Sequence, residues 1–109
     1  MYHRGVIPSR DRLLQLARLV GPDAFAERFG PPLLLETIPD VEALRALVGE
    51  RIDHVARGLV EEAAASDDVI DTASAIAYLD DRLRTLDDLL SPQQADRIRA
   101  SFSERTAGW

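Results

Sequence analysis

The chain has 109 residues, of which 46% are hydrophobic and 29% charged, and its formal net charge is −6. These values fit one globular domain over residues 1–109 and exclude a largely disordered chain. The absence of cysteine excludes disulfide bonds, thiolate catalysis and cysteine-ligated metal centres. The excess of acidic residues disfavours binding to a nucleic-acid backbone and favours a partner with a basic surface.

No apolar stretch is long enough to span a bilayer, so we expect no membrane contact. The first residues, Met1 to Arg12, carry no apolar run behind their arginine and do not resemble a secretory signal. The sequence therefore predicts a cytoplasmic protein.

The N-terminal third predicts two short helices. Ser9 is placed to cap the first helix, which Gly21-Pro22 ends. Asp23 is placed to cap a second helix that closes at Gly30. The apolar segment that follows, residues 33–38, fits either a helical turn or an extended strand of chain laid over the core.

Residues 10–38 also suggest an alternative function. The sequence Phe25-Ala26-Glu27-Arg28-Phe29-Gly30 resembles the middle of a helix-turn-helix, with an alanine under the second helix and a glycine in the turn. The recognition helix would then begin at Pro31-Pro32 and would offer no arginine, lysine, asparagine or glutamine to base edges. The resemblance implies a DNA-binding regulator with a degenerate helix-turn-helix, whereas the side chains make nucleic-acid binding the less favoured function.

Two long amphipathic helices are predicted in the centre of the chain. Asp40 is expected to cap a helix over Val41–Ala65, about 37 Å long, and Ser66-Asp67-Asp68 to cap a second one over Val69–Leu90, about 33 Å long. The short loop between them predicts antiparallel neighbours. In the second helix, apolar residues recur with the spacing of one helix face, at Ile76, Leu79, Leu83, Leu86 and Leu90.

The C-terminal part predicts one more helix. Ser91-Pro92-Gln93-Gln94 has serine at the N-cap, proline at the first helical position and glutamine at the third, which together form a capping box. The helix would bury Ile98 and Phe102. Trp109 follows in a polar tail, where it would either dock on the body or contact a partner.

The side chains with catalytic or metal-binding chemistry form no complete site. Glu50 and His54 are four residues apart, so one helix face could present both to a metal, but a third ligand is missing from the pattern. No nucleophile elbow and no phosphate-binding loop occurs. We therefore predict no metal and no cofactor, and an enzyme is less favoured than a binding protein. A metal or small-molecule site inside the helical bundle, for which only Glu50 and His54 are candidates, stays open as a third function class.

These observations predict an all-α fold of four to five helices around a central antiparallel helical hairpin. The predicted function is a small protein–protein interaction module, such as an adaptor, accessory subunit or regulator, that self-associates because two hairpins would complete a four-helix bundle. The predicted partner-binding residues are Leu79, Leu83, Leu86, Leu90 and Trp109. The predicted core comprises Leu13, Leu14, Val20, Phe25, Phe29, Leu44, Val48, Ile52, Val55, Leu59, Ile76, Leu79, Leu83, Leu86, Ile98 and Phe102.

Overall fold

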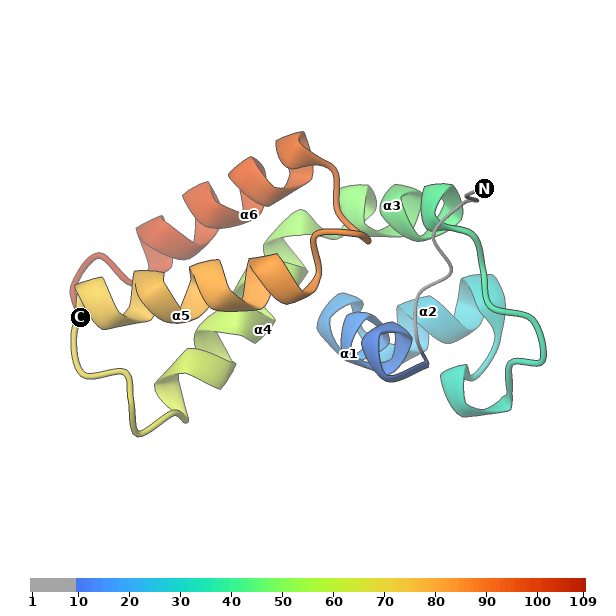
Figure 1. The fold of residues 1–109 in the computed structure, drawn as a ribbon, viewed down its shortest axis with the longest axis horizontal. Coiled ribbons are helices and arrows are strands. Elements are labelled where there is room, and N and C mark those ends of the chain that lie inside the picture. The colour runs from blue at the N-terminus through green and yellow to red at the C-terminus, as the bar shows by residue number, and fades with distance from the viewer. Residues whose placement is uncertain (1–9) are drawn as a thin grey trace, which may run out of the picture.

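The computed structural model describes residues 10–109, and it begins with two short helices joined at Gly21 (Figure 1). Helix α1 (Arg10–Val20) ends where Gly21 adopts a φ of 102°, a conformation that favours glycine. Helix α2 (Pro22–Phe29) has proline at its first position and Gly21 as its N-cap. The predicted cap at Asp23 is therefore wrong, because this residue lies inside the first turn. The predicted cap at Ser9 lies outside the described residues.

A single 3-10 turn, η1 (Pro32–Leu34), follows α2. Gly30 closes α2 by donating its backbone N–H to the carbonyl of Ala26 at 2.9 Å. The N–H of Leu34 then donates to the carbonyl of Pro31 at 3.0 Å. The segment left open by the sequence is thus a short helical turn, and no α-helix forms where a recognition helix would begin.

Helix α3 (Val41–Glu50) starts at the predicted cap, because the Asp40 carboxylate accepts the backbone N–H of Ala43 at 2.8 Å. The prediction that this helix continues to Ala65 is wrong. The helix is interrupted at Arg51, whose φ of −133° and ψ of 35° are not helical, and α4 (Ile52–Ala64) begins one residue later.

A tertiary contact accompanies this interruption. The guanidinium Nε of Arg51 donates to the carbonyl of Val20 at the end of α1. The backbone N–H of Arg51 bonds to the carbonyl of Val48 at 2.9 Å, one residue closer in sequence than the α-helical partner. Arg51 is thus held by α1 at the point where α3 ends and α4 takes a new direction.

Helix α5 (Thr72–Thr85) begins three residues later than predicted, and its cap is Asp71 rather than the Ser66–Asp68 segment. The Asp71 carboxylate accepts the N–H of Ser74 at 2.8 Å, and the Ser74 hydroxyl oxygen accepts the N–H of Asp71 at 3.0 Å. This capping box leaves Val69 and Ile70 in the loop between α4 and α5.

Helix α5 also ends five residues before the predicted end at Leu90. Residues 86–90 form consecutive turns, in which the N–H of Leu89 donates to the carbonyl of Leu86 at 2.8 Å. Helix α6 (Pro92–Arg105) follows, and its capping box is confirmed: Ser91 and Gln94 exchange two hydrogen bonds of 3.2 Å between side chain and backbone.

Helix α4 lies at the centre of the arrangement and packs most extensively against α6. Helices α5 and α6 lie over α4 at one end of the molecule, while α1, α2 and η1 form the other end (Figure 1). Helices α1 and α4 come close at Gly58, where a Cβ atom would lie 3.2 Å from Cδ2 of Leu19. The absence of a side chain at Gly58 therefore allows the two helices to pack closely.

The core is one continuous cluster of buried aliphatic and aromatic side chains. Most of the predicted core residues are buried in it, and the partly buried exceptions are Leu14, Phe29 and Ile76. Buried residues that were not predicted for the core include Leu16, Leu19, Leu47, Leu89 and Leu90.

The all-α prediction is confirmed for residues 10–109, which form six α-helices and no strand. The arrangement differs from the predicted hairpin of two long arms, since the first arm is divided at Arg51 and the second is shortened at both ends. In the same part of the chain, no helix combines the length and the apolar character needed to cross a bilayer.

Candidate functional site

The predicted partner-binding leucines lie in the core of the chain itself. Leu79 and Leu83 project from α5, while Leu86 and Leu90 belong to the turns before α6, and all four are buried. These side chains pack against other parts of one copy. Trp109 differs from them, because 39% of its surface is exposed.

Trp109 belongs to an apolar surface at the end of the molecule where the α4–α5 loop and the C-terminal residues meet (Figure 1). A shallow groove of about 390 Å³ is lined there by Ala64, Val69, Ile70, Gly108 and Trp109, and we call these five residues the end patch. Ile70 is 84% exposed, the most exposed large apolar side chain among residues 10–109.

Hydrogen bonds fix the backbone on which the end patch is built. The N–H of Ile70 donates to the hydroxyl oxygen of Ser74 at 2.8 Å, and Thr72 Oγ1 donates to the carbonyl of Thr106 at 3.1 Å. The N–H of Trp109 also donates to the Thr106 carbonyl, at 3.1 Å. The start of α5 and the residues after α6 are therefore joined through the carbonyl of the buried Thr106.

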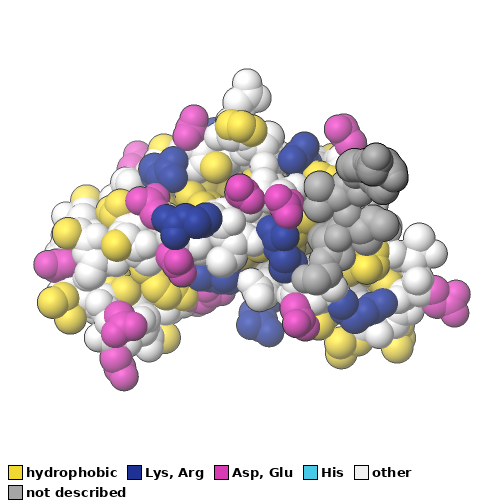
Figure 2. Space-filling view, in the orientation of Figure 1, with side chains coloured by type: hydrophobic (Ala, Val, Ile, Leu, Met, Phe, Trp, Pro, Cys, Tyr) yellow, Lys and Arg dark blue, Asp and Glu magenta, His cyan; other side chains and the backbone are white. Residues whose placement is uncertain are grey.

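Acidic residues surround the apolar part of this surface. Asp67 and Asp68 precede Val69, and Asp71 follows Ile70. On the face drawn in Figure 2, the outer edge of this end carries apolar and acidic side chains, and basic side chains lie closer to the middle of the molecule. Hydrogen bonds from the backbone N–H and then from the hydroxyl of Ser74 lower the pKa of Asp71 below its usual value.

A second exposed apolar site lies at the opposite end, on η1. Leu33 is 74% exposed and Leu34 is 75% exposed. The guanidinium of Arg10 holds this turn by donating to the carbonyl of Pro32 at 3.2 Å and to that of Leu35 at 2.9 Å. This is the segment where the helix-turn-helix resemblance expects a recognition helix, and it presents leucines on a three-residue turn instead.

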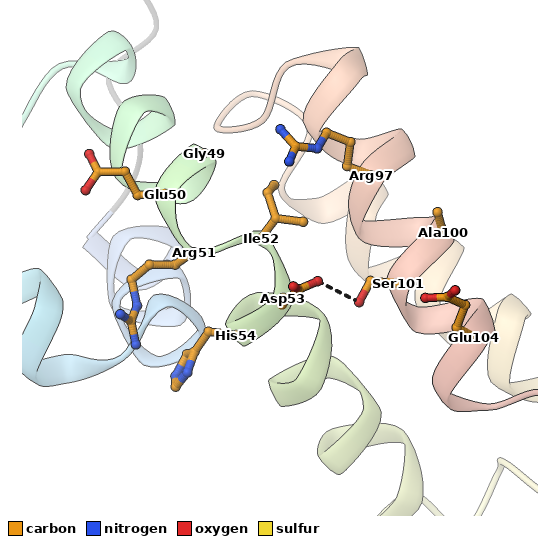
Figure 3. A pocket seen from close by; sticks show the side chains of 10 residues that line it. All are labelled: Gly49, Glu50, Arg51, Ile52, Asp53, His54, Arg97, Ala100, Ser101 and Glu104. Atoms are coloured by element: carbon orange, nitrogen blue, oxygen red, sulfur yellow. Dashed lines mark hydrogen bonds between the residues drawn. The ribbon is translucent and has the colours of Figure 1, made fainter.

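A groove with a volume of about 580 Å³ lies between the α3–α4 interruption and α6 (Figure 3). Its walls carry both signs of charge, including Arg97 and Glu104 from α6. The hydroxyl of Ser101 donates to the Asp53 carboxylate at 3.1 Å across the groove. Ser101 is buried, and its hydrogen bond to Asp53 links α6 to α4.

The predicted metal-ligand pair is separated by the helix interruption. Glu50 ends α3 and pairs with Arg28 at 2.7 Å, whereas His54 lies in the first turn of α4 (Figure 3). The Nε2 atom of His54 lies beside Gly21, 3.3 Å from where a Cβ atom would be. Within residues 10–109, no three histidine or acidic side chains are placed to hold a metal ion.

Comparison with known proteins adds no relative from which a site could be transferred. No protein-family model matches the chain, and no curated protein or solved structure shows significant similarity to it.

Sequence reasoning missed Ile70 as a surface residue. It was expected inside a helix, because Ser66, Asp67 and Asp68 offered three candidate caps before it. The signal that could have found it is the later pair Asp71 and Ser74, which stand at the N-cap and third helical positions of a capping box.

Proposed function

We propose that this protein is a helical protein–protein interaction module and that its partner binds at the end patch. The observation that carries this proposal is Ile70, an aliphatic side chain that is 84% exposed beside the half-exposed Trp109. Exposed apolar side chains that gather on a folded domain often mark an interaction site. Tryptophan is enriched among the residues that contribute most to binding energy at interfaces.

The chemistry of the rest of the surface supports a binding role over a catalytic one. In the groove between α4 and α6, the only serine hydroxyl, that of Ser101, already donates a hydrogen bond to the Asp53 carboxylate. The two candidate metal ligands, Glu50 and His54, lie on different helices. The end patch, in contrast, places aliphatic and aromatic carbon at the surface on a backbone fixed by hydrogen bonds.

Substitution of Ile70 tests the proposal. Ile70→Glu places a charge in the apolar part of the end patch, so we expect loss of partner capture when the immobilised variant replaces the immobilised wild-type chain in native lysate. Because Ile70 is exposed, the free energy of unfolding should change by no more than about 0.5 kcal/mol. The measurement is mass spectrometry of the captured proteins together with urea denaturation of each variant.

The matched control is Leu33→Glu, which makes the same kind of change at a similarly exposed residue at the other end of the molecule. It should capture the same proteins as the wild type. Identical captured proteins with all three chains, or none with the wild type, would contradict a partner site at the end patch.

A further inference from the structure

We propose that the end patch binds a basic amphipathic segment of another protein, with an apolar side chain against Ile70 and Trp109 and with lysine or arginine over Asp67 and Asp68. This inference rests on the proposed function and names the chemistry of the partner. It follows from the charge around the patch, the size of its apolar part and the rigidity of its backbone.

The acidic residues of the α4–α5 loop form no ion pair within the described chain. From Gly58 to Asp81 the sequence has seven acidic residues and no basic one. Of these acids, Glu62, Asp80 and Asp81 form ion pairs with arginines outside this stretch. The ion pairs of residues 10–109 do not include Asp67 or Asp68. A partner with positive charge would therefore gain attraction here, and one with negative charge would be repelled.

The apolar part of the patch is suited to one anchoring side chain. The groove beside Ile70 and Trp109 measures about 390 Å³, and the five residues that line it are few compared with the roughly 20–30 residues per partner in a stable interface. A short segment with an apolar anchor matches such a surface better than a broad domain face does.

The same features disfavour a second copy of this chain as the occupant. A symmetric dimer would place the end patch against itself, because the same surface meets on both subunits. Asp67 and Asp68 of one copy would then face those of the other, and like charges across an interface are repulsive. The buried leucines of α5 also leave no apolar stripe for such a dimer.

The backbone of the end patch is already ordered before binding. Ile70 and Asp71 both donate their N–H groups to the Ser74 hydroxyl, at 2.8 and 3.0 Å, and Thr72 is joined to Thr106. Binding then needs little ordering of this loop, which lowers the entropic cost of association.

Trp109 makes the proposal directly testable, because it is the only tryptophan of the chain. The probes are two tryptophan-free synthetic amphipathic helices, one of leucine and lysine and the other of leucine and glutamate. We expect the leucine–lysine peptide to shift the emission of Trp109 to shorter wavelength, with a Kd that rises several-fold between low and physiological salt. The leucine–glutamate peptide should cause no shift.

Two charge variants of equal net charge separate a local effect from general attraction. Asp67→Asn combined with Asp68→Asn should weaken binding of the leucine–lysine peptide several-fold. Glu27→Gln combined with Glu36→Gln removes two exposed acids at the other end and should leave the Kd unchanged. Equal weakening by both pairs would overturn the proposal.

The outcomes also distinguish this inference from the proposed function. Binding of both peptides with equal affinity, lost in Ile70→Glu, would keep the end patch as an interaction site and overturn the basic partner. No response of Trp109 to either peptide would contradict both. A dimer of the peptide-free chain in light scattering, converted to a monomer by Ile70→Glu, would identify a second copy as the occupant instead.

Discussion

Tyr78 belongs to a cluster of polar side chains that joins three helices in this protein. Its hydroxyl donates to Oε1 of Glu62 at 3.1 Å, and Nε of Arg82 donates to the same oxygen at 3.1 Å. Arg82 also donates to the side-chain oxygen of Gln15 at 3.1 Å, so the cluster connects α1, α4 and α5. Burial of the hydroxyl and then the nearby Glu62 carboxylate raise the pKa of Tyr78 above its ordinary value of 10.0.

This raised pKa predicts a loss of stability in alkaline solution. Since Tyr78 holds its proton more tightly when folded, its contribution is complete below pH 10.0 and is lost as the pH rises through the folded pKa. The free energy of unfolding of the wild type should fall over that range, and the fall should be smaller in Tyr78→Phe. Urea denaturation at several alkaline pH values measures both, and equal slopes for the two chains would refute the prediction.

At the scale of the element, the helix boundaries set by local capping were predictable. Asp40 and Ser91 cap their helices as expected, because an N-cap needs only the backbone N–H groups two or three residues ahead. The boundary at Arg51 was not predictable, since its partner is the carbonyl of Val20, 31 residues away in sequence. The early end of α5 likewise accompanies a long-range pair, between Arg12 and Asp88 at 2.7 Å.

The candidate site was predicted only in part for the same reason. Trp109 was recognised as a surface candidate from its position in a polar tail, and the structure exposes it. The periodic leucines around Leu86 indicated an apolar face correctly, but periodicity does not tell whether that face is covered by the same chain. Here the turns before α6 place Leu86 and Leu90 in the same core as the buried leucines of α5.

Removal of the Arg51 side chain tests the role assigned to it. Arg51→Ala leaves the Val20 carbonyl without its guanidinium donor, so we expect a loss of about 1–2 kcal/mol in the free energy of unfolding. Arg57→Ala is the matched control, because Arg57 is exposed on α4 and its side chain makes no hydrogen bond or ion pair within residues 10–109. Urea denaturation compares the two, and equal losses would show that the contact with Val20 does not stabilise the fold.

On the scale of the whole molecule, the residues that form the core and the residues of the proposed binding surface lie in different places. The molecule measures 42 × 34 × 24 Å, with the end patch at one end of its long axis and η1 at the other (Figures 1 and 2). The leucines of α5 and of the following turns hold the helices together between these ends. Stability and partner binding should therefore respond to different substitutions.

Truncation of Leu86 makes this separation measurable. Leu86 is buried, so Leu86→Ala should lower the free energy of unfolding by about 2–5 kcal/mol through lost burial and a cavity. At a temperature where the variant is still folded, its affinity for the leucine–lysine peptide should equal that of the wild type. Ile70→Ala should show the reverse pattern. Lost binding with unchanged stability in Leu86→Ala would restore the leucine stripe as a partner surface.

The absence of basic residues between Gly58 and Asp81 has a practical consequence for the α4–α5 loop. Trypsin cleaves after lysine and arginine, so it has no cleavage site anywhere in this exposed connection. Digestion with trypsin would leave the loop intact however often it opened. A protease that cleaves after acidic residues, in contrast, meets Asp67 and Asp68 at once, and protection of these bonds would reveal when the surface beside them is covered.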